Sequence, residues 1–124
     1  MLRRISIILF AALLAAALPR ASAAEELVML EEDGCIWCAR WNADVGPIYP
    51  KTPEGALAPL RRVDINDPLP EDITLTRPAF FTPTFVLVRD GIELARIEGY
   101  PGEAFFWGLL DRMLKENTDF AGAS

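Results

Sequence analysis

The feature that most constrains this chain is its pair of cysteines, Cys35 and Cys38, which are its only two and stand two residues apart. The pair follows an apolar run and an acidic turn at 31–34, and it precedes a segment whose composition suits a helix. At a helix N-terminus, exposed backbone N–H groups and the helix dipole favour the thiolate of Cys35. A low-pKa thiolate beside a resolving thiol is the reactive part of a dithiol oxidoreductase. The spacing therefore favours redox chemistry.

Two cysteines at this spacing also occur in three other roles. A structural zinc site needs about four nitrogen or sulfur ligands, and the chain has no histidine and no third cysteine, so no metal is expected. Copper(I) accepts two thiolates, but no Met-rich or His-rich segment accompanies them. A static disulfide is the main alternative, although a bond between Cys35 and Cys38 closes too small a loop to remove much entropy from the unfolded chain. No cofactor is expected.

The amino end has the pattern of an export signal. Two arginines are followed by an uninterrupted apolar run at 5–18 and by small residues at 21–23. Fourteen apolar residues are few for a membrane span, and the small residues fit cleavage better than anchoring. The sequence thus predicts a signal peptide over 1–23, with an uncleaved anchor as the alternative, and one mature domain over 24–124. The expected location is the bacterial periplasm.

The charge of the mature domain limits its partners. Loss of the signal peptide removes three arginines and takes the net charge from −6 to −9. Such an acidic domain is a poor binder of nucleic acid or of an anionic membrane. A protein partner with a basic or neutral face is therefore expected. In an oxidising compartment the cysteines stay paired unless another molecule delivers electrons to them.

The remaining pattern predicts an α/β domain with the order βαβ followed by ββα, in which helices pack against a mixed sheet. Asp90-Gly91 indicates a hairpin, and a slip in the alternation at Ala95-Arg96 suggests a bulge. The stretch 71–81 has no clear period and has room for one short helix. The expected elements are strand 27–30, helix 38–45, an irregular connection at 48–59 with one helical turn at 54–57, strand 60–65, buried central strand 85–88, strand 92–97 and helix 103–115.

Two helices carry predicted inner faces. Trp41 and Val45 are four residues apart and form the inner face of the cysteine-bearing helix, where Trp41 is expected to be a core residue. The last helix is amphipathic. Its predicted inner face consists of two adjacent rows, the first Phe106, Leu110 and Leu114 and the second Phe105, Leu109 and Met113.

This order, with Cys-x-x-Cys at the start of the first helix and Thr-Pro-Thr at 82–84 before the third strand, resembles the thioredoxin fold over residues 26–116. The resemblance implies a mixed four-stranded sheet flanked by helices. It also implies dithiol chemistry at Cys35 and Cys38. By the same resemblance, the peptide bond of Pro83 is cis, and Thr82 offers its backbone to an extended substrate strand.

A narrower resemblance rests on the segments 34–41, 46–52 and 58–64. These are similar to the SoxS-type periplasmic thioredoxins of sulfur-oxidation clusters, and the proline-rich connection is their more specific part. The resemblance implies that the dithiol reduces disulfides on the carrier cysteine of a sulfur-carrier protein. It implies that electrons come from a membrane thiol transporter.

The site also departs from ordinary thioredoxin. Gly34 stands where thioredoxin has Trp before its first cysteine, and Ile-Trp replaces Gly-Pro between the cysteines. Thioredoxin has a buried Asp, which acts as a base, six residues before its first cysteine, and Met29 stands at that position here. Glu31 or Glu32 replaces that base only if the fold turns one of them inward. By charge, these acids raise the thiol pKa and Arg40 lowers it, so the net sign stays open.

The expected mechanism is reduction of a partner protein. Cys35 attacks a disulfide on the partner, and Cys38 resolves the mixed disulfide. Thr82 and Pro83 shape the groove, and Trp37 supplies an apolar contact. A thiol oxidase or disulfide isomerase remains open because the potential, not the motif, sets direction. A peptide-binding module with a structural disulfide is the alternative from another class. The protein is expected to be a monomer, and the absence of a dimerisation domain argues against an isomerase.

Overall fold

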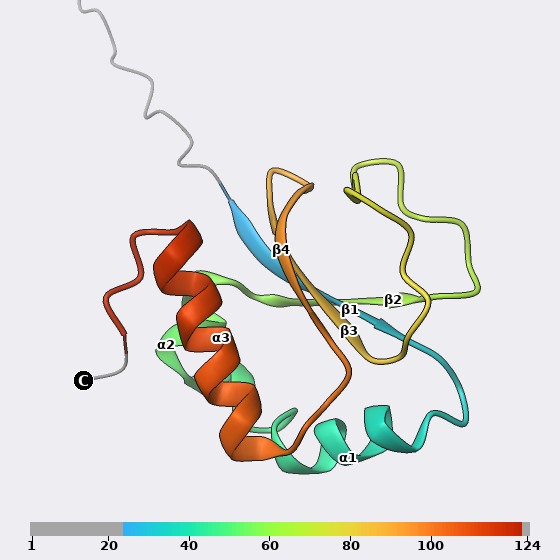
Figure 1. The fold of residues 1–124 in the computed structure, drawn as a ribbon, viewed down its shortest axis with the longest axis horizontal. Coiled ribbons are helices and arrows are strands. Elements are labelled where there is room, and N and C mark those ends of the chain that lie inside the picture. The colour runs from blue at the N-terminus through green and yellow to red at the C-terminus, as the bar shows by residue number, and fades with distance from the viewer. Residues whose placement is uncertain (1–23, 123–124) are drawn as a thin grey trace, which may run out of the picture.

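The apolar run at 27–30 lies inside β1 (Glu25–Glu31), an inner strand of the sheet. The computed structural model describes residues 24–122 (Figure 1), and the predicted signal peptide lies outside these described residues. β1 pairs in parallel with β2 (Leu60–Asp64) and antiparallel with β3 (Thr84–Arg89). β4 (Ile92–Glu98) pairs antiparallel with β3 and completes the order β2-β1-β3-β4. This is the predicted mixed four-stranded sheet.

One face of the sheet is covered by helices. They are α1 (Ile36–Asp44), the 3-10 helix η1 (Tyr49–Lys51), α2 (Pro53–Leu57) and α3 (Glu103–Asn117). The predicted helical turn in the connection is thus α2, preceded by η1. A single core joins the helices to this sheet face. Its sheet residues include Leu27, Met29, Phe85 and Leu87. No helix among the described residues has the length and hydropathy to cross a membrane.

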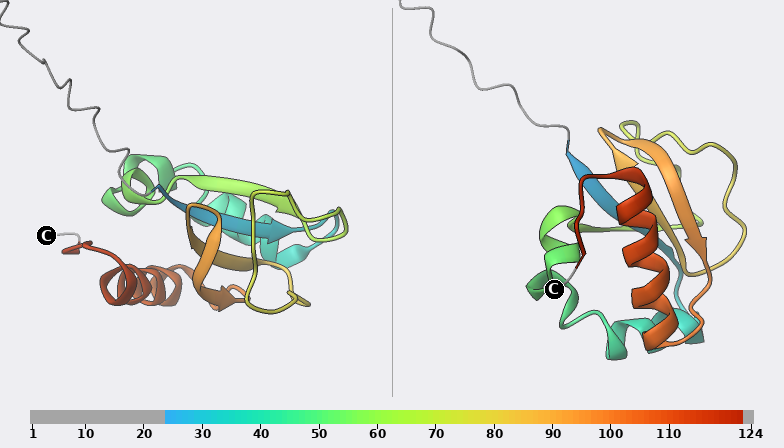
Figure 2. Two further views of the ribbon diagram at one scale, coloured as in Figure 1. Left: turned by 90° about the horizontal axis from the view of Figure 1, so that it is seen from above. Right: turned by 60° about the vertical axis from the view of Figure 1, so that its left-hand side comes forward.

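The opposite face is covered by the connection 66–83 rather than by a helix, as its path on the right in Figure 2 shows. Stretch 71–81 therefore lacks the short helix for which the sequence has room. Thr74 N–H donates to the carbonyl of Gly91, and Glu93 N–H donates to that of Thr74. This backbone pairing with the edge of β4 holds the segment extended, which is incompatible with helical hydrogen bonding.

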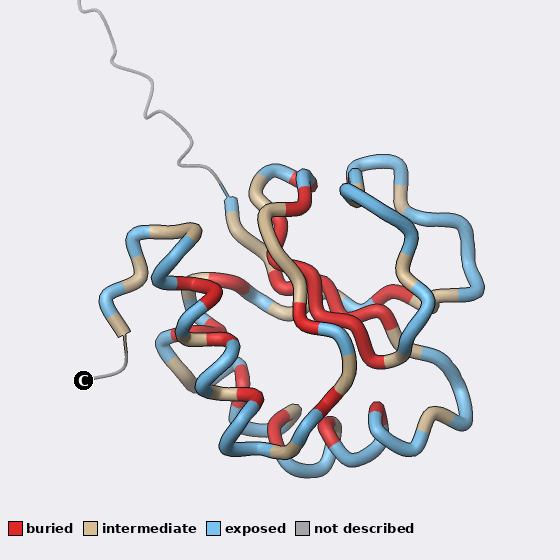
Figure 3. Tube along the Cα trace, in the orientation of Figure 1, coloured by how far each residue is buried: buried red, intermediate tan, exposed pale blue. Residues whose placement is uncertain are grey.

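The central strand and the hairpin follow their local patterns. Residues 85–88 are fully buried, as Figure 3 shows along β3. At the hairpin, Asp90 and Gly91 have φ angles of 50° and 81°, as expected for a tight primed turn. The register then shifts between Leu87 and Val88, leaving Leu94 as the extra residue. The predicted bulge is confirmed, one residue earlier than expected.

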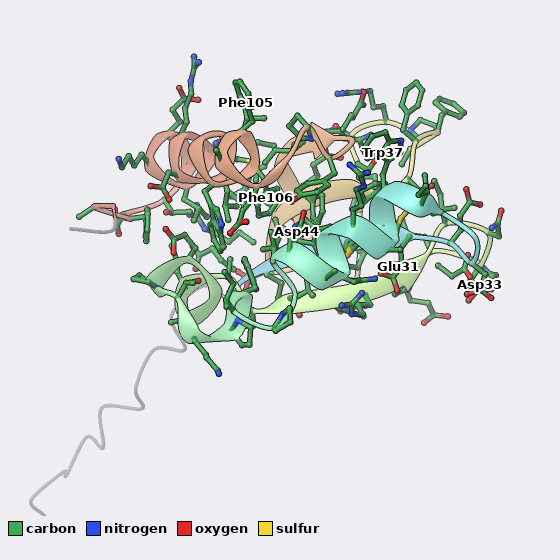
Figure 4. The ribbon with its side chains drawn as sticks, turned by 90° about the horizontal axis from the view of Figure 1, so that it is seen from below. Glu31, Asp33, Trp37, Asp44, Phe105 and Phe106 are labelled. Carbon is green, nitrogen blue, oxygen red and sulfur yellow. A yellow bond between two sulfur atoms is a disulfide. The ribbon has the colours of Figure 1, made fainter. Side chains whose placement is uncertain are left out.

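In α3 one predicted row is correct and the other is mostly wrong. Phe106, Leu110 and Leu114 are buried, and so is Met113. Phe105 is 71% exposed and Leu109 is 43% exposed; Figure 4 shows Phe105 pointing away from the protein and Phe106 pointing inward. The inner face is rotated toward Trp107, whose ring stacks on Tyr49 at a centroid distance of 6.2 Å. Docking of η1 against α3 therefore decides which row is buried.

The contact between α2 and α3 contains two carboxyl groups. Glu54 is only 4% exposed, and it faces Asp111 of α3, the hydroxyl of Thr52 and Tyr49 of η1. Burial raises the pKa of Glu54 above its ordinary value of 4.5, and its hydrogen bond with Asp111 raises it further. Because the folded pKa exceeds the unfolded one, the contribution of Glu54 to stability is greatest below pH 4.5 and is lost as the pH rises through the folded pKa.

We expect Glu54→Gln to raise the free energy of unfolding by about 0.5–2 kcal/mol at neutral pH. The amide of glutamine donates to Asp111 without a charge. The free energy of unfolding of the variant should therefore lack the decrease with rising pH that ionisation of Glu54 causes. The gain should vanish well below pH 4.5, as urea unfolding across pH would show. The matched control is Glu116→Gln, at an exposed carboxylate paired with Arg112. Equal or lower stability of Glu54→Gln at neutral pH would contradict this explanation.

Candidate redox site

Cys35 and Cys38 form a disulfide at the start of α1. Cys35 is the N-cap, and its Sγ accepts a hydrogen bond from the backbone N–H of Cys38 at 3.1 Å. This cap makes α1 begin at Ile36 instead of at residue 38 as predicted. Cys35 is half-buried and Cys38 is only 4% exposed. One sulfur is thus accessible to a partner, and the other is shielded below it.

The segment before β3 is tied to the turn that leads into Cys35. The Thr82–Pro83 peptide bond is cis, and Pro83 is buried. The hydroxyl of Thr82 donates to Oε1 of Glu32 at 3.0 Å. The N–H of Gly99 donates to the carbonyl of Pro83 at 2.7 Å. These bonds fix the 82–83 segment between β4 and the turn before Cys35.

Trp37 and Thr82, predicted as substrate contacts, line one open pocket of about 360 Å³. Phe81, Glu98 and Gly99 complete this pocket. Phe81 was not predicted from the sequence, although two adjacent phenylalanines in a connection are a visible signal. In the structure, Phe80 and Phe81 are 80% and 60% exposed. The pocket is a candidate surface for an apolar group of a partner.

The tryptophans of α1 have different environments. Trp37 is 49% exposed, and the guanidinium carbon of Arg40 lies 5.3 Å from the centroid of its ring. Trp41 is fully buried, as predicted for a core residue. Figure 4 shows Trp37 and Glu31 at the end of α1 that carries the disulfide. An apolar ring and an acidic group therefore both border the cysteines.

A second, polar pocket of about 280 Å³ lies beside the disulfide. Glu31 is turned toward this pocket, and its carboxylate pairs with Arg62 of β2 at 2.5 Å. Arg62 also lies over the ring of Trp41, at 5.9 Å from its centroid. Met29, which occupies the position of thioredoxin's buried Asp, is fully buried and contacts Arg62 through its sulfur at 3.7 Å. Arg62 and this pocket were not anticipated from the sequence.

The connection before Thr82 is anchored by a buried ion pair within β4. Arg96 and Glu93 pair at 2.6 Å, with side chains only 4% and 2% exposed. Arg96 also donates to the carbonyls of Arg77 and Pro78, at 2.7 and 3.2 Å. Glu93 accepts the N–H of Thr76 at 2.9 Å. The pair therefore holds the part of the connection that leads to Thr82 and Pro83.

The comparisons with known proteins give one solved relative of high identity. No protein-family model matches the chain, and no curated protein matches it. The crystal structure of the periplasmic thioredoxin SoxS from Paracoccus pantotrophus, in its reduced form, is 50% identical in sequence. The match covers 74% of this chain and 97% of that chain, with a TM-score of 0.73. Together with the disulfide in Cys-x-x-Cys spacing, this shows that the chain belongs to the SoxS-type thioredoxins and is a thiol:disulfide oxidoreductase acting on protein thiols.

Proposed function

We propose that this protein is a periplasmic reductase of disulfides on a sulfur-carrier protein. The observation that carries the proposal is the asymmetry of the pair, because Cys35 is a half-exposed helix N-cap and Cys38 is shielded. The relative's description as periplasmic and the signal-peptide pattern over 1–23 support the location. We also propose that a membrane thiol transporter supplies the electrons and that the protein acts as a monomer.

The proposed reaction has two thiol–disulfide exchanges. The Cys35 thiolate attacks one sulfur of the partner's disulfide, forming a mixed disulfide and releasing the other sulfur as a thiolate. Cys38, after losing its proton, attacks Cys35 and releases the reduced carrier thiolate. The partner gains two electrons, and Cys35 and Cys38 end as a disulfide. The transporter's dithiol then reduces this disulfide.

The partner surface is assigned to the residues beside Cys35. Thr82 and Pro83 are proposed to hold an extended segment of the carrier, with Trp37 packed against an apolar group. The support is the pocket shared by Trp37 and Thr82 and the hydrogen bonds that fix the 82–83 segment. Asp33 and Glu32, both exposed, favour a basic or neutral face on the carrier.

We expect Cys38→Ser to accumulate a mixed disulfide between Cys35 and a purified sulfur-carrier protein whose carrier cysteine is in a disulfide. Without the resolving thiol, the second exchange cannot occur, so the adduct should reach near-stoichiometric yield on a non-reducing gel. The matched control is Cys35→Ser, which also lacks the disulfide but should form no adduct. If neither variant formed the adduct, or if both formed it in equal yield, the roles assigned to the two cysteines would be wrong.

The direction of electron flow has a separate test. A reduction potential near about −270 mV fits a reductase, and one near about −120 mV fits an oxidant. The exposed Trp37 offers a fluorescence signal beside the disulfide for this titration. Full biological activity of a variant with both cysteines replaced by serine would instead favour a peptide-binding module.

A further inference from the structure

We propose that the outer edge of β2 binds a second extended segment of the carrier protein, one in which basic and apolar side chains alternate. This inference rests on the proposed function and adds a contact to the one assigned to Thr82 and Pro83. Among the described residues, β2 has β1 as its only neighbouring strand, and the left-hand view of Figure 2 shows it at the outside of the sheet. An extended chain can pair with the free N–H and C=O groups of such an edge.

The pairing of β2 with β1 identifies the backbone groups that are free. The N–H of Ile65 donates to the carbonyl of Glu31 in β1. Because backbone groups alternate in direction along a strand, every second residue before Ile65 also faces β1. The residues between them face outward, namely Leu60, Arg62 and Asp64. Their N–H groups point away from the sheet, where the carbonyls of an added strand would accept them.

The two edges of the sheet differ in how they are protected. At β4, the backbone of Thr74 pairs with the edge. Charged side chains can protect an edge, but both arginines of β2 are held by acids. Arg61 donates to Asp72 at 2.6 and 2.8 Å, and Arg62 pairs with Glu31. These ion pairs hold the two guanidinium groups over opposite faces of the sheet, so the edge itself stays open.

The open edge lies between two pockets on opposite faces of the sheet. One is the polar pocket of about 280 Å³ beside the disulfide, under α1. The other has a volume of about 450 Å³ and lies under the connection 66–83. Val63 and Asp64 border both pockets. Alternate side chains of an added strand point to opposite faces, so one set would meet the polar pocket and the other set the second pocket. The second pocket has a largely apolar lining, which includes Leu30, Val63, Ile65, Leu69 and Leu75.

The polar pocket favours a basic side chain. It is bordered by one guanidinium, that of Arg62, and by four carboxylates, those of Glu31, Glu32, Asp33 and Asp64. Oδ1 of Asn42, which also borders this pocket, is buried and accepts no hydrogen bond from any described residue. A lysine or arginine would supply both a donor and the opposite charge. The second pocket would take an aliphatic or aromatic side chain.

The position of Cys35 favours the carrier as the occupant. Cys35 borders the same polar pocket, so a carrier joined to it by a disulfide has chain within reach of β2. A second copy of this protein is a poor fit. Two-fold antiparallel pairing about the middle of β2 would place Arg62 opposite its own copy, and like charges in that position are destabilising. Two mature domains that each carry a net charge of −9 also repel each other.

The first test measures amide hydrogen exchange in the mixed disulfide between the mature Cys38→Ser protein and a purified sulfur-carrier protein. We expect the N–H groups of Leu60, Arg62 and Asp64 to exchange at least about tenfold more slowly in this adduct than in free Cys38→Ser. The matched control is Cys38→Ser with a single thionitrobenzoate on Cys35, which is too small to add a strand and should leave these amides unchanged.

The outcomes separate this inference from the proposed function. Unchanged exchange of the three outward amides in the carrier adduct would overturn the inference. Slower exchange at high protein concentration without the carrier would also overturn it, because a second copy would then be the occupant. Failure of the carrier adduct to form would instead refute the proposed function on which the inference rests.

A second test separates backbone pairing from charge at Asp64. Asp64→Ala and Asp64→Pro both remove the carboxylate, but only proline also removes the outward N–H. Edge strands tolerate proline where the N–H faces solvent, and circular dichroism would check that both variants fold. We expect the KM for the carrier to be about two- to tenfold higher in Asp64→Pro than in Asp64→Ala, the effect of one lost hydrogen bond. Equal KM values in the two folded variants would contradict strand addition at β2.

Discussion

Replacing Arg96 with alanine is expected to lower the free energy of unfolding by about 3–5 kcal/mol, the usual cost of leaving one buried charge without its partner. The Glu93 side chain is 2% exposed and would keep its carboxylate in the interior without an opposite charge. The carbonyls of Arg77 and Pro78 would also lose their donor. Urea unfolding monitored by tryptophan fluorescence would measure the loss.

A matched arginine on the surface provides the control. Arg112 pairs with Glu116 at 2.9 Å, but its side chain is 77% exposed. Arg112→Ala should therefore cost no more than about 0.5 kcal/mol. Equal losses for Arg96→Ala and Arg112→Ala would show that burial of the Glu93–Arg96 pair does not govern its contribution.

The pH dependence gives the same experiment a second readout. Burial alone would raise the pKa of Glu93, but the hydrogen bonds from Arg96 and from the N–H of Thr76 outweigh it and hold that pKa below 4.5. Stability from a lowered folded pKa is present above 4.5 and is lost as pH falls through the folded pKa. The Arg96→Ala variant should therefore lose less stability on acidification than the unmodified protein.

This anchor also concerns the site. Arg96 binds the connection a few residues before Thr82 and Pro83, which are proposed to hold the partner. We expect Arg96→Ala, at a temperature where it remains folded, to weaken reduction of the carrier more than reduction of a small aromatic disulfide. The small disulfide needs only Cys35, whereas the carrier also needs the 82–83 segment in place.

The second large effect is expected at Trp41. Replacing Trp41 with alanine should lower the free energy of unfolding by about 3–5 kcal/mol. Trp41 is fully buried. Its ring centroid lies 5.2 Å from that of Phe85, 5.8 Å from that of Phe106 and 6.1 Å from that of Tyr49. Only Cys38 and Trp41 are buried within α1. Trp41 therefore supplies most of the apolar surface that holds the cysteine-bearing helix on the sheet.

Trp41→Phe is the matched control for Trp41→Ala. Phenylalanine keeps an aromatic ring against Phe85 and Phe106 and leaves a smaller cavity, so this variant should lose less stability than Trp41→Ala. Unfolding by urea, compared at one pH, measures both. A similar loss for the two variants would contradict this explanation, because neither the retained ring nor the smaller cavity would then have any effect on stability.

Much of the fold followed from local sequence signals. Continuous apolar residues at 85–88 predicted a strand buried on both faces, and Asp90-Gly91 predicted the hairpin, because both depend on neighbouring residues alone. The Cys-x-x-Cys spacing also predicted that Cys35 would lie at a helix N-terminus, since the cap and the first turn are adjacent in sequence. These features need no information about distant contacts.

The failures came from contacts between distant segments. The stretch 71–81 is extended because Thr74 pairs with the edge of β4, and Phe105 is exposed because Tyr49 draws Trp107 into the interface. Neither partner is visible in the local pattern. Sequence periodicity measures the amphipathicity of one element, but the neighbouring element decides which side of it is covered.

The cysteine pair and its dithiol chemistry were determined by the sequence itself, because spacing and helix capping are local properties. The surroundings of Cys38 were decided only by the tertiary structure. Glu31, Asn42 and Arg62 come from β1, α1 and β2, and they border one pocket because the parallel pairing of β1 with β2 places Arg62 beside Met29, under α1. The packing of these elements pairs Glu31 with Arg62 at the pocket, while Glu32, which also borders it, accepts a hydrogen bond from Thr82.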